Sequence, residues 1–140
     1  FQTDIRIDWN DVDMLGHVNN LAIMRYMQTA TVLYFENIGL SPNDKELAVR
    51  SIMASVRGQF KKQLFYPGII RVLTHVLEMK TTSIHLKHYV VNSKNEIVAE
   101  GLNILEMFDF YKNCKCEITN ETRRWIERIE CKKKMQAILI

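Results

Sequence analysis

The chain has 140 residues, of which 47% are hydrophobic and 25% are charged, a balance typical of one folded domain with a buried core. Its formal net charge is +3 and the basic residues are scattered, so the composition gives no electrostatic indication of nucleic-acid binding. No run of about 20 apolar residues occurs, so we expect no membrane span, no signal peptide and a cytoplasmic location.

The first part of the chain predicts one strand followed by one long, buried helix. Residues Gln2–Asp8 alternate between apolar and polar side chains, which is the pattern of a half-buried strand. After a polar loop, about two-thirds of the residues in Leu21–Ile38 are apolar, so this helix must be covered on most sides. Asn19 or Asn20 is a favourable N-cap, and Gly39 is a natural residue to end the helix.

The second part predicts an antiparallel sheet, with turns at Lys80–Thr82 and Asn92–Asn95. The four predicted strands are Ser51–Phe65, Ile69–Met79, Ser83–Val91 and Ile97–Phe110. A short helix is expected at Glu121–Glu130, after a cap at Thr119 or Asn120. The simplest α+β arrangement wraps an antiparallel sheet of about five strands around the long helix. We therefore expect a single domain over residues 1–130 and a terminal extension over residues 131–140.

The cysteines and the strand histidines do not indicate a metal site. Cys114 and Cys116 lack the usual spacing of zinc ligands, and with Cys131 the cysteine count is odd, which also argues against a disulfide framework. The histidines expected to be ordinary residues of the sheet are His75, His85 and His88. We predict neither a metal nor a redox cofactor.

The polar loop directly before the long helix is the predicted site of chemistry. Asp8–Asn20 gathers acidic residues, asparagines, a glycine and a histidine beside the most apolar segment, where polar groups are costly unless hydrogen-bonded or used. The first amides of a helix lack intrahelical partners and favour negative charge, so they would stabilise a carbonyl oxygen that becomes anionic during acyl transfer. Asp13 is placed to supply a base or nucleophile, although an aspartate in such a loop often only forms a turn.

The segment Asp11–Asn20 reads Asp-Val-Asp-Met-Leu-Gly-His-Val-Asn-Asn. It resembles the Asp-x-Asp-x-x-Gly-His-Val-Asn-Asn signature of hot-dog-fold thioesterases of the 4-hydroxybenzoyl-CoA thioesterase-like group. The order of elements agrees with that group over roughly residues 2–130, and Phe108–Lys112 followed by a short helix is also similar. The resemblance implies a hot-dog fold, hydrolysis of an acyl thioester, and a site between protomers of a homodimer or a dimer of dimers.

By this resemblance, Asp13 matches the catalytic carboxylate, which acts as a nucleophile on the thioester or as a base toward water. His17 matches the histidine that acyl-carrier-protein thioesterases of this fold use beside their aspartate; alternatively it orients the loop. Asn20 matches the residue whose backbone amide polarises the thioester carbonyl, and we expect Asp11 to be structural, accepting backbone amides. The other signature residues expected to bind substrate are Gly16, Val18 and Asn19.

The carrier of the acyl group stays open at this point. We expect acyl-CoA, with Lys61, Lys62 and Arg57 either meeting its phosphates or forming a solvated strand end. The first alternative is an acyl-carrier-protein thioesterase; in those relatives an asparagine stands where this chain has Leu15. The second alternative is a non-catalytic module that binds acyl-CoA.

Overall fold

The computed structural model describes the backbone of residues 1–139 and the side chains of residues 1–131. Its strands are β1 (Gln2–Arg6), β2 (Val49–Phe60), β3 (Ile69–Met79), β4 (Ser83–Val91), β5 (Ile97–Asp109) and β6 (Cys114–Lys115). Its helices are the one-turn 3₁₀ helix η1 (Trp9–Asp11), α1 (Asn20–Asn37) and α2 (Asn120–Leu139).

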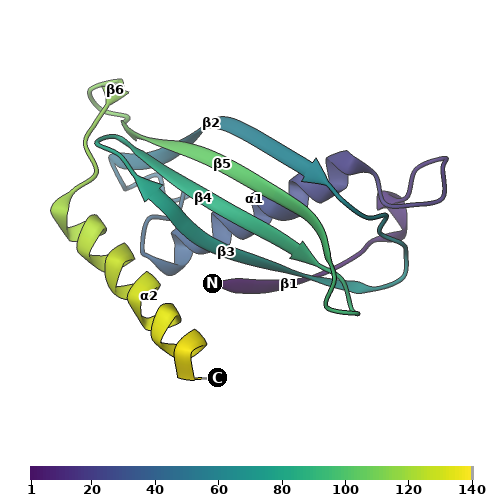
Figure 1. Cartoon of the computed structure of the whole chain (residues 1–140). Helices are drawn as coiled ribbons and strands as arrows, with labels where there is room; N and C mark the ends of the chain where they lie inside the picture. Colours follow the sequence, from purple (N-terminus) through teal and green to yellow (C-terminus); the bar gives the residue numbers. More distant parts are fainter. Residues whose placement is uncertain (140) are drawn as a thin grey trace.

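One antiparallel sheet with the strand order β1-β3-β4-β5-β2 forms the body of the protein, and β6 pairs with the end of β5. The helix α1 lies along one face of this sheet and contacts β3, β4 and β5 (Figure 1). The predicted combination of a curved antiparallel sheet and one long covered helix is therefore confirmed. Asn19 is the N-cap of α1, which confirms one of the two predicted caps, because its side chain accepts a hydrogen bond from the Leu21 amide.

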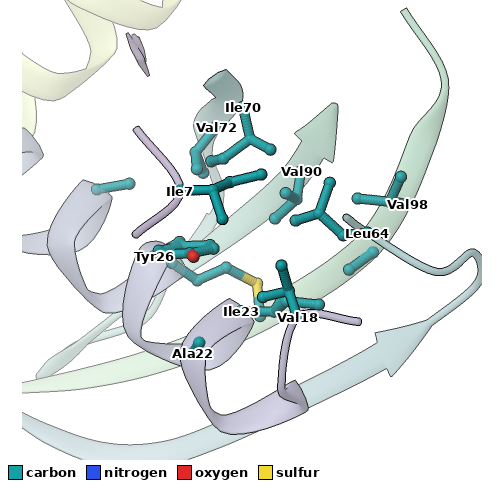
Figure 2. Packing of buried hydrophobic residues seen from close by; sticks show 13 residues of the cluster. Ile7, Val18, Ala22, Ile23, Tyr26, Leu64, Ile70, Val72, Val90 and Val98 are labelled. Carbon is teal, nitrogen blue, oxygen red and sulfur yellow. The ribbon is translucent and has the colours of Figure 1, made fainter. Parts of the chain in front are cut away.

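The side of α1 that faces the sheet is buried, because two apolar clusters cover its two halves. The cluster around the first half contains Ile23, Tyr26 and Met27 and receives Ile7, Val72 and Val90 from the strands and their connections (Figure 2). The cluster around the second half contains Tyr34 and Phe35, neither of which has any exposed surface. Burial of these large side chains is the main source of the helix's stability.

A buried polar layer separates the two clusters. Thr31 of α1 donates its hydroxyl proton to the Met27 carbonyl oxygen at 3.0 Å, so its oxygen accepts hydrogen bonds from the other neighbours. His88 Nε2 and Asn103 Nδ2 each lie 3.0 Å from the Thr31 hydroxyl oxygen, and Thr74 Oγ1 lies 2.9 Å from His88 Nδ1. This pattern fits a neutral imidazole with its proton on Nε2. His88 is thus the centre of the layer, a role that its position on a strand did not predict.

Two boundaries differ from the prediction by more than two residues. The strand expected to reach Phe65 ends at Phe60, because the Lys61 and Lys62 amides both turn to the Val98 carbonyl oxygen, at 2.8 and 3.1 Å. The C-terminal helix begins within one residue of the expected start but continues to Leu139, through most of the predicted extension, which contains no proline or glycine. No helix in the described part of the chain has the length and apolar composition needed to cross a membrane.

Candidate active site

The predicted polar loop folds into a small hairpin between η1 and α1. Val12 and Val18 form an antiparallel bridge, and inside it the Asp13 amide donates to the His17 carbonyl oxygen at 3.1 Å. The turn is closed by Gly16, whose amide donates to the Asp13 carbonyl oxygen at 3.1 Å and whose φ of 86° lies in the left-handed region that favours glycine. The two predicted catalytic residues therefore occupy facing positions on the two arms of the hairpin.

The second arm leads directly into α1 and leaves one amide free. The Leu21 amide is held by the Asn19 side chain at 2.8 Å, and the Ala22 and Ile23 amides by the Asn19 carbonyl oxygen at 3.0 and 3.2 Å. The Asn20 amide donates no hydrogen bond to any group in the described chain, and the Asn20 residue is exposed. A free amide at the positive end of a helix is a donor suited to a developing oxyanion.

The residue Asp13 is partly buried, and its carboxylate forms the turn that the sequence offered as its alternative role. Its Oδ1 accepts a hydrogen bond from the Leu15 amide at 2.9 Å. Within the described residues no hydrogen bond joins the side chains of Asp13 and His17. The Leu15 contact uses one carboxylate oxygen, so the contact fixes the orientation of the group without using all of its acceptor capacity.

A cavity of about 180 Å³ opens beside the start of α1. It is lined by His17, Val18, Asn20 and Ile23 on one side and by Phe60 and residues 61–64 on the other. The structure therefore brings three of the predicted site residues, His17, Val18 and Asn20, together at one cavity. Asp13, Gly16 and Asn19 do not belong to its lining; they lie in the adjoining hairpin and at the helix cap. The hairpin is held here by Leu64, whose carbonyl oxygen accepts from the Val18 amide at 2.7 Å.

Two lysines at the rim of this cavity provide positive charge. Lys61 pairs with Glu100 at 3.0 Å, and Lys62 pairs with Glu96. All four side chains keep some contact with solvent, and the lysine hydrogen bonds lower the pKa of both glutamates. Such exposed pairs are weak, so both ammonium groups can exchange their partners for an anionic ligand at little cost.

A larger cavity of about 530 Å³ lies at the other end of α1. Its lining includes Ile38, Leu40, Met107 and Trp125 and none of the predicted site residues. The 18 residues of α1 separate the two ends of the helix by about 27 Å. The larger cavity is therefore not part of the hairpin site within one chain, and chemistry rather than volume identifies the candidate site.

Asp11 anchors the hairpin more elaborately than the sequence predicted. It accepts one backbone amide as expected, from Asp8 at 3.3 Å, but it also accepts the Tyr26 hydroxyl at 2.6 Å and pairs with the Arg25 guanidinium. Burial raises the pKa of the Asp11 carboxyl, but the hydrogen bonds from Tyr26 and Arg25 outweigh it and hold that pKa below the usual value. Sequence reasoning missed Arg25 and Tyr26 as partners, and their only signal was their place one turn into the helix.

Comparison with known families decides the relationship suggested by the signature. The family model of the thioesterase-like superfamily matches residues 7–126. The chain belongs to this superfamily. The matched region contains the hairpin, α1 and every strand except β1 and thus agrees with the resemblance carried by Asp11–Asn20. The superfamily assignment makes the protein a thioester hydrolase. A comparison with curated protein sequences gives no match.

Solved structures of several thioesterases share the fold. The gentisyl-coenzyme A thioesterase BH1999 superposes with a TM-score of 0.79 at 20% identity, covering 90% of this chain and 99% of its own. A DHNA-CoA thioesterase from Staphylococcus aureus superposes with a TM-score of 0.76 at 21% identity, covering 98% and 91%. A Staphylococcus aureus protein solved in complex with CoA gives 0.84 at 11% identity, covering 91% and 82%. The predicted hot-dog fold of this superfamily member is thereby confirmed.

Proposed function

We propose that this superfamily member hydrolyses an acyl-CoA thioester, with Asp13 as base or nucleophile and the Asn20 amide as the oxyanion donor. The observation that carries the proposal is the free amide of Asn20, a residue that lines a cavity beside the hairpin that holds Asp13. The proposed acyl-CoA substrate agrees with the structural relatives, two of which are coenzyme A thioesterases and one of which was solved in complex with CoA.

The first step of the proposed reaction can follow either of two routes. Either Asp13 takes a proton from water as the oxygen of that water attacks the thioester carbonyl carbon, or the Asp13 carboxylate attacks that carbon itself and water later hydrolyses the anhydride. In both cases negative charge develops on the carbonyl oxygen, where a helix-terminal amide stabilises it. The carbon–sulfur bond then breaks and the CoA thiolate leaves, taking the proton that Asp13 accepted in the first route or a proton from solvent in the second. The first route yields the free acid at this point, whereas in the second route water hydrolyses the acyl–Asp13 anhydride to the free acid and restores the carboxylate.

The charge distribution supports CoA as the carrier. Lys61 and Lys62 lie at the rim of the cavity, and the phosphates of CoA would meet their ammonium groups as the acyl end approaches Asn20. These lysines recognise the carrier and not the acyl group. Their contribution to substrate binding should therefore disappear for a substrate without phosphates.

A panel of matched thioesters tests this function. One acyl group is offered on CoA, on an acyl carrier protein and on N-acetylcysteamine, and the free thiol is measured. We expect turnover of acyl-CoA, and we expect the Lys61→Ala/Lys62→Ala variant to raise KM for acyl-CoA but not for the N-acetylcysteamine thioester. Lys94→Ala, which removes another exposed lysine, serves as the control. Preference for the carrier protein would favour the first alternative, and binding without turnover of any substrate would favour a non-catalytic module.

We also propose that the protein acts as a homodimer or a dimer of dimers. β2 is an edge strand that pairs with β5 on one side only, within the strands described. It carries three partly exposed large apolar side chains, Ile52, Val56 and Phe60. A long, apolar edge is a usual place for association. A monomeric mass by light scattering at assay concentration would refute this part of the proposal; the cytoplasmic location stays a prediction.

A further inference from the structure

We propose that Asp11 is a positioning residue for the hydrolysis. Its buried carboxylate fixes the hairpin, which contains Asp13, against the second turn of α1. The inference rests on the proposed role of Asp13 and extends it to Asp11, Arg25 and Tyr26. The reacting carboxylate and the oxyanion amide lie on different segments, so something must fix the distance between them.

The carboxylate of Asp11 reaches α1 with both of its oxygens. Oδ1 accepts from the Arg25 guanidinium, and Oδ2 accepts from the Tyr26 hydroxyl at 2.6 Å and from the Asp8 amide at 3.3 Å. Asp11 is only 7% exposed, and the Tyr26 ring belongs to the apolar cluster around the first half of α1 (Figure 2). The carboxylate is therefore attached to a buried part of the helix.

The backbone of Asp11 holds the hairpin at the same point. Its carbonyl oxygen accepts from the Asn19 amide at 2.8 Å, directly before the free amide of Asn20. Val12, the next residue, forms the bridge to Val18 that closes the hairpin, and Asp13 follows. A movement of Asp11 thus moves Asp13 relative to Asn20, and a misplacement of about 1 Å in a reacting pair costs about 10²-fold in rate.

The hydrogen bonds also determine which substitution is informative. Three groups donate to the Asp11 carboxylate, namely the Arg25 guanidinium, the Tyr26 hydroxyl and the Asp8 backbone amide. In Asp11→Asn the new NH₂ group faces the Arg25 guanidinium in one orientation of the amide and the Asp8 backbone amide in the other. The contact between the hairpin and α1 is therefore weakened although the size of the side chain is kept. Tyr26→Phe removes one donor while the carboxylate stays in place, so both substitutions act on the same contact and their effects on kcat should not add.

The test compares kcat and KM with the best acyl thioester for the wild type, Asp11→Asn, Tyr26→Phe and the double variant. All are assayed at a temperature where circular dichroism shows each to be folded. We expect Asp11→Asn to lower kcat by about 10²-fold with KM within a few-fold. We expect the double variant to stay close to Asp11→Asn in kcat, because both substitutions break the same contact. Asp8→Asn, which removes the neighbouring negative charge but keeps the side-chain acceptor that caps η1, should stay within a few-fold of the wild type.

Asp13→Asn, run in parallel, separates the two proposals. If it abolishes turnover while Asp11→Asn and Tyr26→Phe keep a normal kcat, Asp11 has no positioning role and the function assigned to Asp13 stands. If Asp13→Asn keeps a normal kcat, the proposed function is overturned and the inference falls with it. If Asp11→Asn does not fold, Tyr26→Phe decides: an unchanged kcat in that variant overturns the inference, and a reduced kcat with unchanged KM supports it.

Discussion

Acid should destabilise the protein through one buried histidine. His88 has no exposed surface, and burial, with a smaller contribution from His75, lowers its pKa from 6.5 to about 4. Its folded-state pKa lies below the unfolded value, so between these two pH values the unfolded chain binds the additional proton. The stability that the neutral imidazole contributes is therefore complete above about pH 6.5, falls as the pH is lowered, and is lost near pH 4.

The size of the effect follows from the shift. A change of one pKa unit corresponds to about 1.4 kcal/mol, so a shift of this size predicts a loss of about 3 kcal/mol in the free energy of unfolding. Nearly all of that loss falls between pH 6.5 and pH 4. This is a large share of the stability of a domain of this length. The structural cause is specific: protonating Nδ1 turns it from an acceptor of the Thr74 hydroxyl into a second donor inside the core.

Urea unfolding followed by circular dichroism at several pH values between 7 and 4 measures this loss. His88→Gln is the control, because a glutamine keeps a polar side chain in the layer but does not titrate. The carboxylates with lowered pKa values, Asp11 among them, lose stability in both proteins, so the difference between the two pH slopes isolates His88. Parallel slopes for the wild type and His88→Gln would refute the assignment of a neutral, buried imidazole.

Four other substitutions, two of them compared as a pair, test the core and the loop. Met27→Asp puts an unpaired charge where no surface is exposed, so we expect no cooperative melting transition. Gly101→Ala should lower the melting temperature more than Gly58→Ala, because its new Cβ overlaps the sulfur of the enclosed Met27, whereas that of Gly58 meets the partly exposed Met24; equal losses would contradict this packing. His17→Gln should keep much of the activity if the histidine orients the loop, since an amide still donates and accepts a hydrogen bond. A loss of about 10²-fold would instead place His17 in proton transfer.

The sequence predicted the fold where local pattern and tertiary contact agree. The alternation of β-branched residues in Ile69–Met79 and the turn residues after Val91 gave the bounds of β3 and β4 correctly. The end of β2 was predicted too late because Phe65 continues the apolar pattern, although the chain has already left the sheet at Lys61. That departure depends on a carbonyl oxygen of β5, which no local pattern reveals.

Only the local features of the candidate site could be predicted from the sequence. The position of Asp13 before a helix and the capping role of Asn19 depend only on neighbouring residues, so both could be predicted from the sequence. The contacts of Asp11 with Tyr26 and the layer around His88 join residues that the chain holds far apart or on different elements. Composition and spacing carry no record of such pairs, and only the packing of α1 against the hairpin and the sheet brings them together.

The most direct test of the account is the hydrolysis of an acyl-CoA by Asp13→Asn, measured beside Asp44→Asn. Both aspartates accept the amide of the residue two positions on, Leu15 at 2.9 Å and Glu46 at 3.0 Å, so both variants make the same change in the same kind of turn. If Asp13 performs chemistry, Asp13→Asn loses about 10²–10⁴-fold in kcat while it still folds and binds CoA, and Asp44→Asn keeps the wild-type rate. Turnover by Asp13→Asn within a few-fold of the wild type would contradict the proposed role of Asp13 as base or nucleophile.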